Sequence, residues 1–230
     1  AIIGLPANIF FGTGIPTVIL VLKQKRQNTD VLIVDASKHF LKEGKNNKLQ
    51  ASDIKRITDA VINRKSINKF SQLVSKQNLR DNGYNLNIPR YVDSSPAAES
   101  WDLHATMLGG IPNSEIANLQ NYWQTLPQLH AVLFAPKSAS YSELAITKDA
   151  VNTTITQHPQ VVEFINTYNQ AFNGFDEYLN TALIQGWATV SRNQQEAQLS
   201  IELFTRLAPI SLIDKYRAYQ HQNNQWQIIS

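Results

Sequence analysis

Three short apolar runs near the start of the chain constrain the fold more than any other feature. They are AIIGL (1–5), IPTVILVLKQ (15–24) and VLIVDAS (31–37). Continuous β-branched runs of this length are typical of strands buried on both faces of a sheet. Few residues separate the runs, so neighbouring strands are expected to pair antiparallel at a sheet edge. The sequence therefore predicts an α/β start, in which residues 15–24 form a central strand covered on both faces.

A Gly-Thr-Gly triplet at residues 12–14 lies between the first two runs. A phosphate-binding loop needs a helix immediately after its glycines, because the helix N-terminus holds the phosphate. Here Ile15-Pro16 and a strand follow, which excludes that interpretation. The triplet is instead expected to form a turn, with Phe10 and Phe11 beside it. Such rings can stack on a flat nucleobase or fill the core, and adjacent residues of an extended chain point in opposite directions.

Beyond residue 40 the pattern changes from strands to helices. A polar loop (41–50) precedes a helix over 52–64, with Ser52 as its cap and an apolar stripe of Ile54, Ile57, Val61 and Ile62. A Ser/Pro/Ala linker at 93–100 then leads into a part rich in Asn and Gln. Helices are expected over 113–127, from Thr147 to His158, and from Pro159 toward Gly186.

The last of these helices carries an uninterrupted heptad seam. Apolar residues recur at spacings of 4 and 3, which is typical of a helix that pairs lengthwise with another helix. The partner is either the neighbouring segment 193–207, in an antiparallel hairpin, or a helix of another subunit; the two can coexist in one bundle. The seam consists of Val161, Ile165, Tyr168, Phe172, Phe175, Leu179 and Ala182.

Charge is distributed unevenly along the chain. Residues 1–90 contain 15 Lys and Arg against 6 Asp and Glu, whereas residues 91–230 contain 6 against 12. Such asymmetry is typical of a first half that faces a polyanion, although a solvated surface would give the same count. Lysines that could reach DNA phosphates cluster in one polar loop, at Lys38, Lys42, Lys45 and Lys48.

Composition excludes several classes of site. The chain has no Cys, and its five His residues lack the spacing of a metal site, so no metal is expected. An apolar run of about 20 residues, as a membrane span requires, is also missing, so no membrane partner is expected. These features fit a cytoplasmic protein.

Several segments together carry a resemblance to a known family. GLPANIFFGTGIPTVILVL, VLIVDASKHF and GYNLNIPRYVD, followed by LGGIPNSEIANLQNYWQTLPQL and PISLIDKYRAYQ, resemble the modification subunit of type I restriction–modification systems. This family comprises N6-adenine DNA methyltransferases. The resemblance implies late strands of a partly truncated S-adenosylmethionine-dependent methyltransferase sheet, followed by an all-α helical region. The implied domains are residues 1–92 (catalytic), 93–112 (linker) and 113–230 (helical, for subunit association).

The resemblance also limits what this chain can do. The family binds S-adenosylmethionine through a glycine-rich loop and holds the flipped adenine with an Asn-Pro-Pro-Phe/Tyr motif, and neither motif occurs here. The chain is therefore expected to be an inactive C-terminal piece with no catalytic residue and no bound cofactor. Residues that the resemblance assigns to one wall of the base pocket are Phe10, Phe11, Gly12, Thr13 and Gly14.

The implied partners are the specificity subunit, a second modification subunit, the restriction subunit and double-stranded DNA. The helical half, with the seam from Val161 to Leu179, would dock on the specificity subunit. The alternative is another DNA adenine methyltransferase, stand-alone or of a phage-defence system, with a helical interaction tail.

Overall fold

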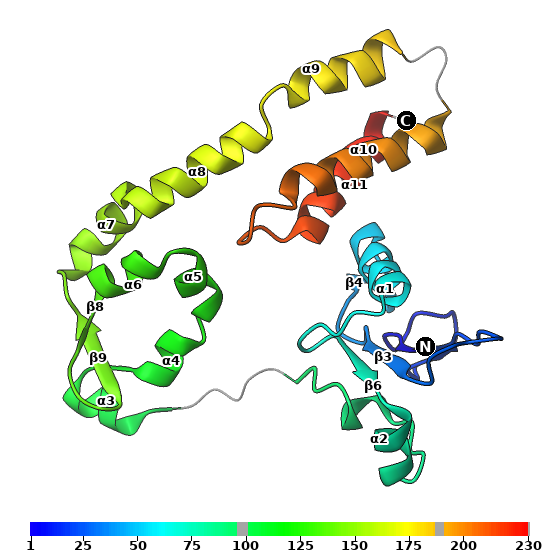
Figure 1. Ribbon diagram of the computed structural model, residues 1–230, viewed down its shortest axis with the longest axis horizontal. Helices are drawn as coiled ribbons and strands as arrows, with labels where there is room; N and C mark the ends of the chain where they lie inside the picture. Colours follow the sequence, from blue (N-terminus) through cyan, green and yellow to red (C-terminus); the bar gives the residue numbers. More distant parts are fainter. Residues whose placement is uncertain (96–100, 187–190, 230) are drawn as a thin grey trace. The chain divides into compact units, whose positions relative to one another are not determined.

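The computed structural model describes residues 1–95, 101–186 and 191–229. The chain divides into two compact units, which are described separately below (Figure 1). Unit 1 comprises Ala1–Ala98 and Tyr216–Ser230, and unit 2 comprises Glu99–Lys215. This division differs from the expected domains, because the C-terminal helix groups with unit 1 and helix α3 (Leu103–Leu108) lies in the expected linker. Part of the linker, residues 96–100, lies outside the described residues.

Unit 1 contains a four-stranded sheet in the order β2-β1-β3-β6. The central strands β1 and β3 are parallel, and the outer strands β2 and β6 are antiparallel to their neighbours. A mixed sheet with helices confirms the α/β class expected for this part of the chain. The strands are β1 (Ile2–Gly4), β2 (Val18–Leu20), β3 (Val31–Asp35) and β6 (Ser71–Val74).

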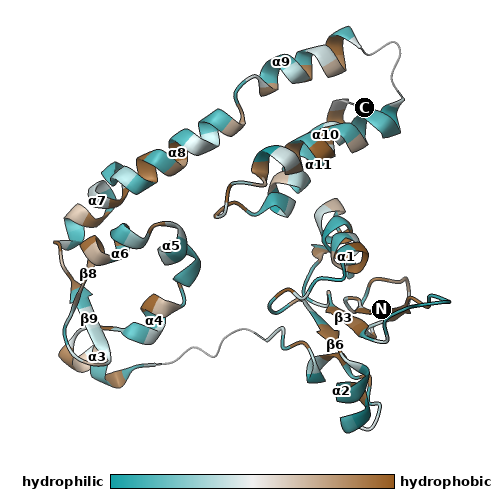
Figure 2. Ribbon diagram, in the orientation of Figure 1, coloured by the Kyte–Doolittle hydropathy of each residue, from teal (hydrophilic) through white to brown (hydrophobic). Residues whose placement is uncertain are grey.

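Strand β3 contributes to two cores because its side chains alternate between the faces of the sheet. Leu32 and Val34 are fully buried in a cluster with Ala60 of helix α1 (Ala51–Asn63). Ile33 is buried on the other face with Leu79, in a cluster supplied by α2 (Lys76–Asp81) and the 3₁₀ turn η1 (Ile88–Arg90). Figure 2 shows the hydrophobic colouring of β3 between these coverings.

Gly4 allows η1 to lie close to the sheet. A Cβ atom at this position would lie 2.6 Å from Cδ1 of Ile88. The segment around Ile88 also holds itself together, since the Tyr91 hydroxyl donates to the Asn85 carbonyl at 2.6 Å and Arg90 donates to Asn82 at 3.1 Å. This part of the sequence therefore covers the sheet.

The prediction of a central, covered strand over 15–24 is wrong for this structure. Only Val18–Leu20 form β2, which is an edge strand, and all three side chains are about half exposed. The strand pairs with β1 on one side, and within the described residues no strand pairs with its other edge. Apolar composition indicates only a preference for burial, and burial also needs a neighbouring segment that supplies the covering surface.

An apolar groove of about 310 Å³ lies beside the same edge. Two residues of the expected helix stripe, Ile57 and Val61, pack against the core, whereas Ile54 and Ile62 are exposed along this groove. Ile19 of β2 forms part of its opposite wall. Among its described residues, unit 1 thus leaves both a strand edge and an adjoining apolar surface without cover.

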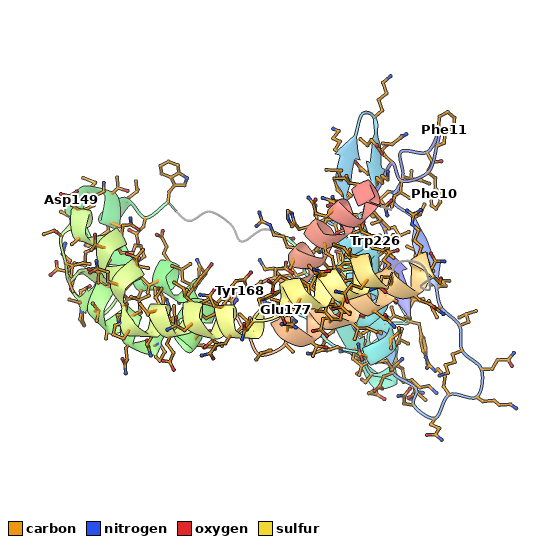
Figure 3. All side chains as sticks on the ribbon, turned by 90° about the horizontal axis from the view of Figure 1, so that it is seen from above. Phe10, Phe11, Asp149, Tyr168, Glu177 and Trp226 are labelled. Carbon is orange, nitrogen blue, oxygen red and sulfur yellow. The ribbon has the colours of Figure 1, made fainter. Side chains whose placement is uncertain are left out.

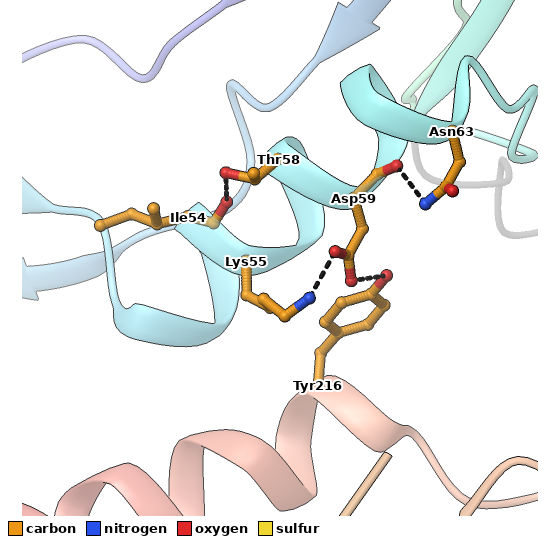
Figure 4. Close-up of polar contacts among 6 residues, drawn as sticks. All are labelled: Ile54, Lys55, Thr58, Asp59, Asn63 and Tyr216. Atoms are coloured by element: carbon orange, nitrogen blue, oxygen red, sulfur yellow. Dashed lines mark hydrogen bonds and ion pairs between the residues drawn. The ribbon is translucent and has the colours of Figure 1, made fainter. Parts of the chain in front are cut away.

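Helix α1 starts one residue before the expected Ser52 cap. Gln50 is its N-cap residue, and the Gln50 amide donates to the Asp53 carboxylate at 2.9 Å. The Ser52 amide instead donates to the Gln220 side chain of α11 (Lys215–Ile229) at 2.9 Å. The Tyr216 hydroxyl donates to Asp59 at 3.1 Å, and Asp59 also pairs with Lys55 (Figure 4). The C-terminal helix is therefore bound along the polar face of α1.

Unit 2 is mostly helical but not all-α, which corrects the expected layout. Strands β7 (Ile111–Pro112), β9 (Tyr141–Leu144) and β8 (Phe134–Pro136) form a three-stranded antiparallel sheet in that order. Pro112 and Pro136 explain the strands, because proline restricts its preceding residue to extended conformations and cannot continue a helix. The expected helix over 113–127 is instead two short helices, α4 (Asn113–Ala117) and α5 (Gln120–Thr125).

Of the remaining helices of unit 2, α6 lies between β7 and β8 in the chain, and the others follow β9. Leu126, Leu129 and Leu133 form a core around α6, against which residues of α7 and α8 pack. The junction at His158-Pro159 is confirmed, since α7 ends at Gln157 and Pro159 is the first residue of α8. These elements are α6 (Pro127–Leu133), the 3₁₀ turn η2 (Lys148–Ala150), α7 (Val151–Gln157), α8 (Pro159–Ala171) and α10 (Arg192–Leu207).

The expected single helix from Pro159 toward Gly186 is interrupted. Helix α8 ends at Ala171, Gly174 adopts a left-handed conformation with φ of 68°, and α9 (Phe175–Leu179) and a π-helical turn η3 (Asn180–Gln185) follow. Arg206 of α10 donates to the carbonyl oxygens of Ala171 and Asn173 at 2.7 and 3.0 Å. A charged donor therefore satisfies carbonyls that the break leaves without a helical partner, and Gly174 readily adopts the left-handed conformation found there.

Candidate nucleic-acid interface

The candidate site lies at one edge of the unit 1 sheet. Strands β1 and β3 are parallel, so both carboxyl ends, at Gly4 and Asp35, meet at the same edge. The loops that follow parallel strands at this edge are where α/β sheets bind their ligands. After β1 comes the aromatic loop, defined here as residues 8–14; after β3 comes a polar segment that leads into a hairpin.

A tight turn places the two phenylalanines of the aromatic loop at the surface. The Thr13 amide donates to the Phe10 carbonyl at 3.3 Å, and Gly12 in the third turn position has φ of 74°. Only a residue without a Cβ adopts that conformation easily, which explains Gly12. Phe11 occupies the tip and is 97% exposed, while Phe10 is 57% exposed (Figure 3). Neither ring is core filling.

The second loop forms a hairpin that carries three of the four predicted lysines. Strands β4 (Leu41–Glu43) and β5 (Asn46–Lys48) pair antiparallel around Gly44, whose φ is 62°. Lys42, Lys45 and Lys48 are exposed. Lys48 lies 3.7 Å from Glu43, but both side chains are about two-thirds exposed, so solvent screens this pair.

Asn47 joins the hairpin to the aromatic loop. Its backbone amide donates to the Asn8 carbonyl at 2.9 Å, and its side-chain Nδ2 donates to the Ala7 carbonyl at 2.8 Å. Asn8 itself has φ of 55°, a conformation that asparagine tolerates better than most residues. Aromatic and basic side chains that are about 30 or more residues apart in the sequence thus share one edge.

A buried carboxylate lies at the start of the second loop. Asp35 is 6% exposed; its Oδ1 accepts from the Ser37 amide at 2.9 Å and its Oδ2 from the Ser94 hydroxyl at 2.6 Å. Burial by itself would raise the pKa of this carboxyl group. The hydrogen bonds from Ser37 and Ser94, with the nearby charge of Lys38, outweigh burial and hold the pKa below its ordinary value. Asp35 is therefore an ionised anchor for the segment that carries Lys38.

The structure brings together the residues predicted from sequence for the base pocket and the DNA backbone. Phe10 to Gly14 and Lys38 to Lys48 lie in the two loops that follow β1 and β3. Sequence reasoning missed Asn47 and Asp35, which organise these loops. For Asp35 a signal existed, since it is an acidic residue directly after a buried apolar strand; Asn47 had no signal beyond the Gly-Lys turn before it.

The heptad seam of unit 2 divides into two parts. Val161 packs on the α6 core, whereas Ile165 and Tyr168 are 48% and 37% exposed. Figure 2 shows hydrophobic and hydrophilic residues alternating along α8. Beyond the break the seam meets α10 of the same chain, where the Arg206 guanidinium lies 5.1 Å from the centre of the Phe175 ring. Within the described residues, Arg206 of the segment 193–207 thus contacts the seam at Phe175, while residues 187–190 of the turn lie outside the described residues.

Neither a metal cluster nor a membrane span occurs in the described part of the chain. No group of three or more His, Asp or Glu residues there is placed to hold a metal ion. No helix among the described residues has the length and apolar character needed to cross a membrane.

Comparison with known proteins identifies relatives of the first half. Residues 1–100 match the family model described as N-6 DNA Methylase. The methylase subunit of type I restriction enzyme MpnII from Mycoplasma pneumoniae is 36% identical over 104 residues, which are 45% of this chain and 19% of that protein. The MjaVIII methylase subunit from Methanocaldococcus jannaschii is 31% identical over 45% of this chain and 18% of its own length.

A solved structure is also similar in sequence. The type I restriction–modification system methyltransferase subunit from Streptococcus thermophilus is 49% identical, with a TM-score of 0.40, over 41% of this chain and 20% of that one. The chain spans about one fifth of the length of the curated relatives it matches. Through its first 100 residues, the chain resembles the methylase subunits of type I restriction enzymes.

Proposed function

We propose that this chain is the C-terminal portion of an adenine-N6 DNA methyltransferase subunit of a type I restriction–modification system. In this proposal unit 1 supplies a DNA-facing edge of the catalytic domain, and unit 2 docks on the specificity subunit. The observation that carries the proposal is the meeting of the aromatic loop and the lysine hairpin at the carboxyl edge of β1 and β3.

The chemistry of this edge suits DNA with an unstacked base. An aromatic face stacks on any nucleobase and contributes about 1–3 kcal/mol per base. Lysines beside it bind phosphates and release counterions, which makes binding depend on salt. Phe10 and Phe11 are exposed where a base could reach them, and Lys38, Lys42 and Lys45 lie on the adjoining segment.

The open edge of β2 supports membership in a larger sheet. Val18, Ile19 and Leu20 are apolar on both faces of the strand and half exposed, and the apolar groove adjoins them. An exposed apolar edge strand promotes aggregation unless another segment covers it. The aligned segment is 19% of the matched methylase subunit, so such a relative contains enough additional chain to supply that cover.

The described residues do not fit S-adenosylmethionine. Gly12 and Gly14 lead into strand β2 and not into a helix N-terminus. Asp35, the carboxylate at the end of β3, accepts hydrogen bonds from Ser37 and Ser94 and so holds groups of this chain. We therefore assign cofactor binding and methyl transfer to the rest of the longer subunit. Isothermal titration of this chain with S-adenosylmethionine should show no saturable heat, and micromolar binding would contradict this assignment.

The exposed part of the seam supports a docking role for unit 2. Ile165 and Tyr168 project from α8 without burial in the described residues of this unit, and heptad spacing favours a partner helix. The specificity subunit, which recognises the DNA sequence in such systems, is the proposed partner. The second modification subunit and the restriction subunit complete the proposed assembly.

DNA binding by the 230-residue chain tests the proposed role of unit 1. Fluorescence anisotropy with a duplex that carries one mismatched adenine should show affinity that falls with added salt. Replacing Lys38, Lys42 and Lys45 by Gln should reduce the slope of log K against log salt by up to about 0.9 for each phosphate that is no longer bound. The matched control is the replacement of Lys65, Lys69 and Lys76, which lie outside the two loops. A salt-independent affinity, or equal effects of both triple variants, would contradict the proposal.

A further inference from the structure

The β4–β5 hairpin lacks the means to hold its own position. It consists of two three-residue strands, whose side chains are mostly exposed. An isolated two-stranded hairpin is at best marginally stable in water. Its orientation must therefore come from contacts with the rest of unit 1.

Asn47 makes two such contacts, one to the first residue of the aromatic loop and one to the residue before that loop. The backbone bond to Asn8 and the side-chain bond to Ala7 attach β5 to the chain directly before Phe10 and Phe11. Asn47 is half-buried, whereas its neighbours Asn46 and Lys48 are exposed on the other face of the strand. Lys48 therefore lies on the face away from this anchor, whereas Lys42, the cross-strand partner of Asn47, shares the anchored face.

We propose that Asn47 is a positioning residue that makes the hairpin and the aromatic loop one DNA-binding unit. The hairpin binds the phosphate backbone of the same strand whose unstacked base contacts Phe11. This inference rests on the proposed function, because it takes DNA as the ligand of this edge, and it adds which strand the lysines hold and which residue sets the spacing.

The physical reason is preorganisation. Phosphate contacts fix the register of a nucleic acid, and base contacts then read or hold the base. If the two loops are fixed relative to each other, a bound phosphate places the base at the ring, and each contact strengthens the other. If the loops move independently, the two contacts contribute separately.

A double-mutant cycle on DNA affinity measures this coupling. Phe11→Ala and Lys45→Gln are combined in the 230-residue chain, with a duplex that carries one mismatched adenine as the probe. The double variant should bind DNA at least about threefold more tightly than the product of the two single-variant losses in affinity predicts. In an Asn47→Ala background the two losses in DNA affinity should simply multiply. The control is Asn46→Ala, because the adjacent Asn46 has no side-chain bond to Ala7, and this substitution should leave the coupling intact.

Spin labels give a second readout that does not depend on DNA. The chain contains no cysteine, so Thr13→Cys and Glu43→Cys introduce a unique labelled pair on the two loops. Asn47→Ala should broaden the distance distribution between the labels, and Asn46→Ala should leave it narrow. Circular dichroism of each variant verifies that the fold is retained.

The outcomes separate this inference from the proposed function. The role of Asn47 would be overturned, without affecting the proposed function, if DNA binding is salt-dependent and the coupling survives Asn47→Ala. Unchanged label distances in that variant would have the same consequence. Absence of DNA binding in the unsubstituted chain would overturn both. Loss of coupling together with a broadened distance distribution, seen with Asn47→Ala and not with Asn46→Ala, supports the inference.

Discussion

Replacing Gly4 by Ala tests whether the segment around Ile88 covers the sheet as closely as the structure shows. The new Cβ would lie 2.6 Å from Cδ1 of Ile88. Carbon atoms pack best at about 3.5–4.0 Å, so Ile88 must move by about 1 Å or leave its rotamer. Overpacking of this kind costs about 1–3 kcal/mol. The lower entropy of the unfolded alanine chain offsets about 0.4–1 kcal/mol of it. We expect Gly4→Ala to lower the free energy of unfolding by about 1–2 kcal/mol in total.

A second substitution identifies the atom responsible. Ile88→Val removes Cδ1 and should cost about 0.5–1.5 kcal/mol alone. In the double variant the new Cβ at position 4 would find space, so the combined loss should be smaller than the sum of the single losses by about 1 kcal/mol. Gly14→Ala is the control, because a Cβ there meets only Asn8 Oδ1, at 3.5 Å.

Hydrogen exchange is the suitable assay because the chain has two units and need not unfold in one step. The Ala36 amide donates to the Gly4 carbonyl at 2.9 Å, so its protection reports on the pairing of β1 with β3. The reasoning is refuted if Gly4→Ala lowers protection no more than Gly14→Ala. It is also refuted if the losses of Gly4→Ala and Ile88→Val simply add.

Four further substitutions test the site and the seam. Phe11→Ala should leave the melting temperature unchanged, because the ring is 97% exposed. Measured by fluorescence anisotropy, it should weaken binding to mismatched DNA by about 5- to 150-fold. An equal loss of affinity for a fully paired duplex would argue against base stacking. Asp35 has a lowered pKa, so its stabilising effect is complete above the unfolded pKa of about 3.9 and is lost as pH falls through the lower folded value. Asp35→Asn should remove this acid dependence from the free energy of unfolding, measured in urea between about pH 2 and about pH 6. An unchanged pH profile in this variant would contradict the stabilising role of Asp35. Ile165→Asp should abolish co-purification with the specificity subunit while the helical circular dichroism persists, and retained co-purification would assign the seam to this chain alone. Arg206→Met should destabilise unit 2 by about 1.5–3 kcal/mol in thermal unfolding, because it removes charged hydrogen bonds to Ala171 and Asn173; a smaller effect than that of Arg192→Met would show that the break does not depend on Arg206.

Local sequence patterns predicted elements well where a single strong signal acted. The alternation of Leu32, Ile33 and Val34 between two cores follows from strand geometry, and Pro159 begins a helix because its fixed φ suits that position. The Phe10–Thr13 turn follows from Gly12, which alone tolerates the required conformation. The assignment of aromatic and basic residues to a DNA-binding site stays a prediction, which rests on residue type and on the family resemblance.

Predictions were wrong where a distant residue competed with the local pattern. The heptad seam is continuous in the sequence, yet the helix breaks after Ala171, where Gly174 is left-handed and Arg206, 35 residues after Ala171, binds a carbonyl that the break leaves free. Residues 15–24 have the composition of a covered strand, yet β2 is an exposed edge because no described segment supplies a covering surface. Strands β7 to β9 have too few residues to leave a periodic signal.

The sequence by itself determined the residue chemistry: an apolar sheet, an aromatic turn, a lysine-rich loop and the resemblance to methylase subunits. Tertiary structure alone decided that the turn and the lysines share an edge, because that follows from the parallel pairing of β1 with β3 and from the bonds of Asn47. The side-chain bond of Asn47 joins residues 40 positions apart. No local pattern encodes such contacts, since they depend on how the whole sheet assembles.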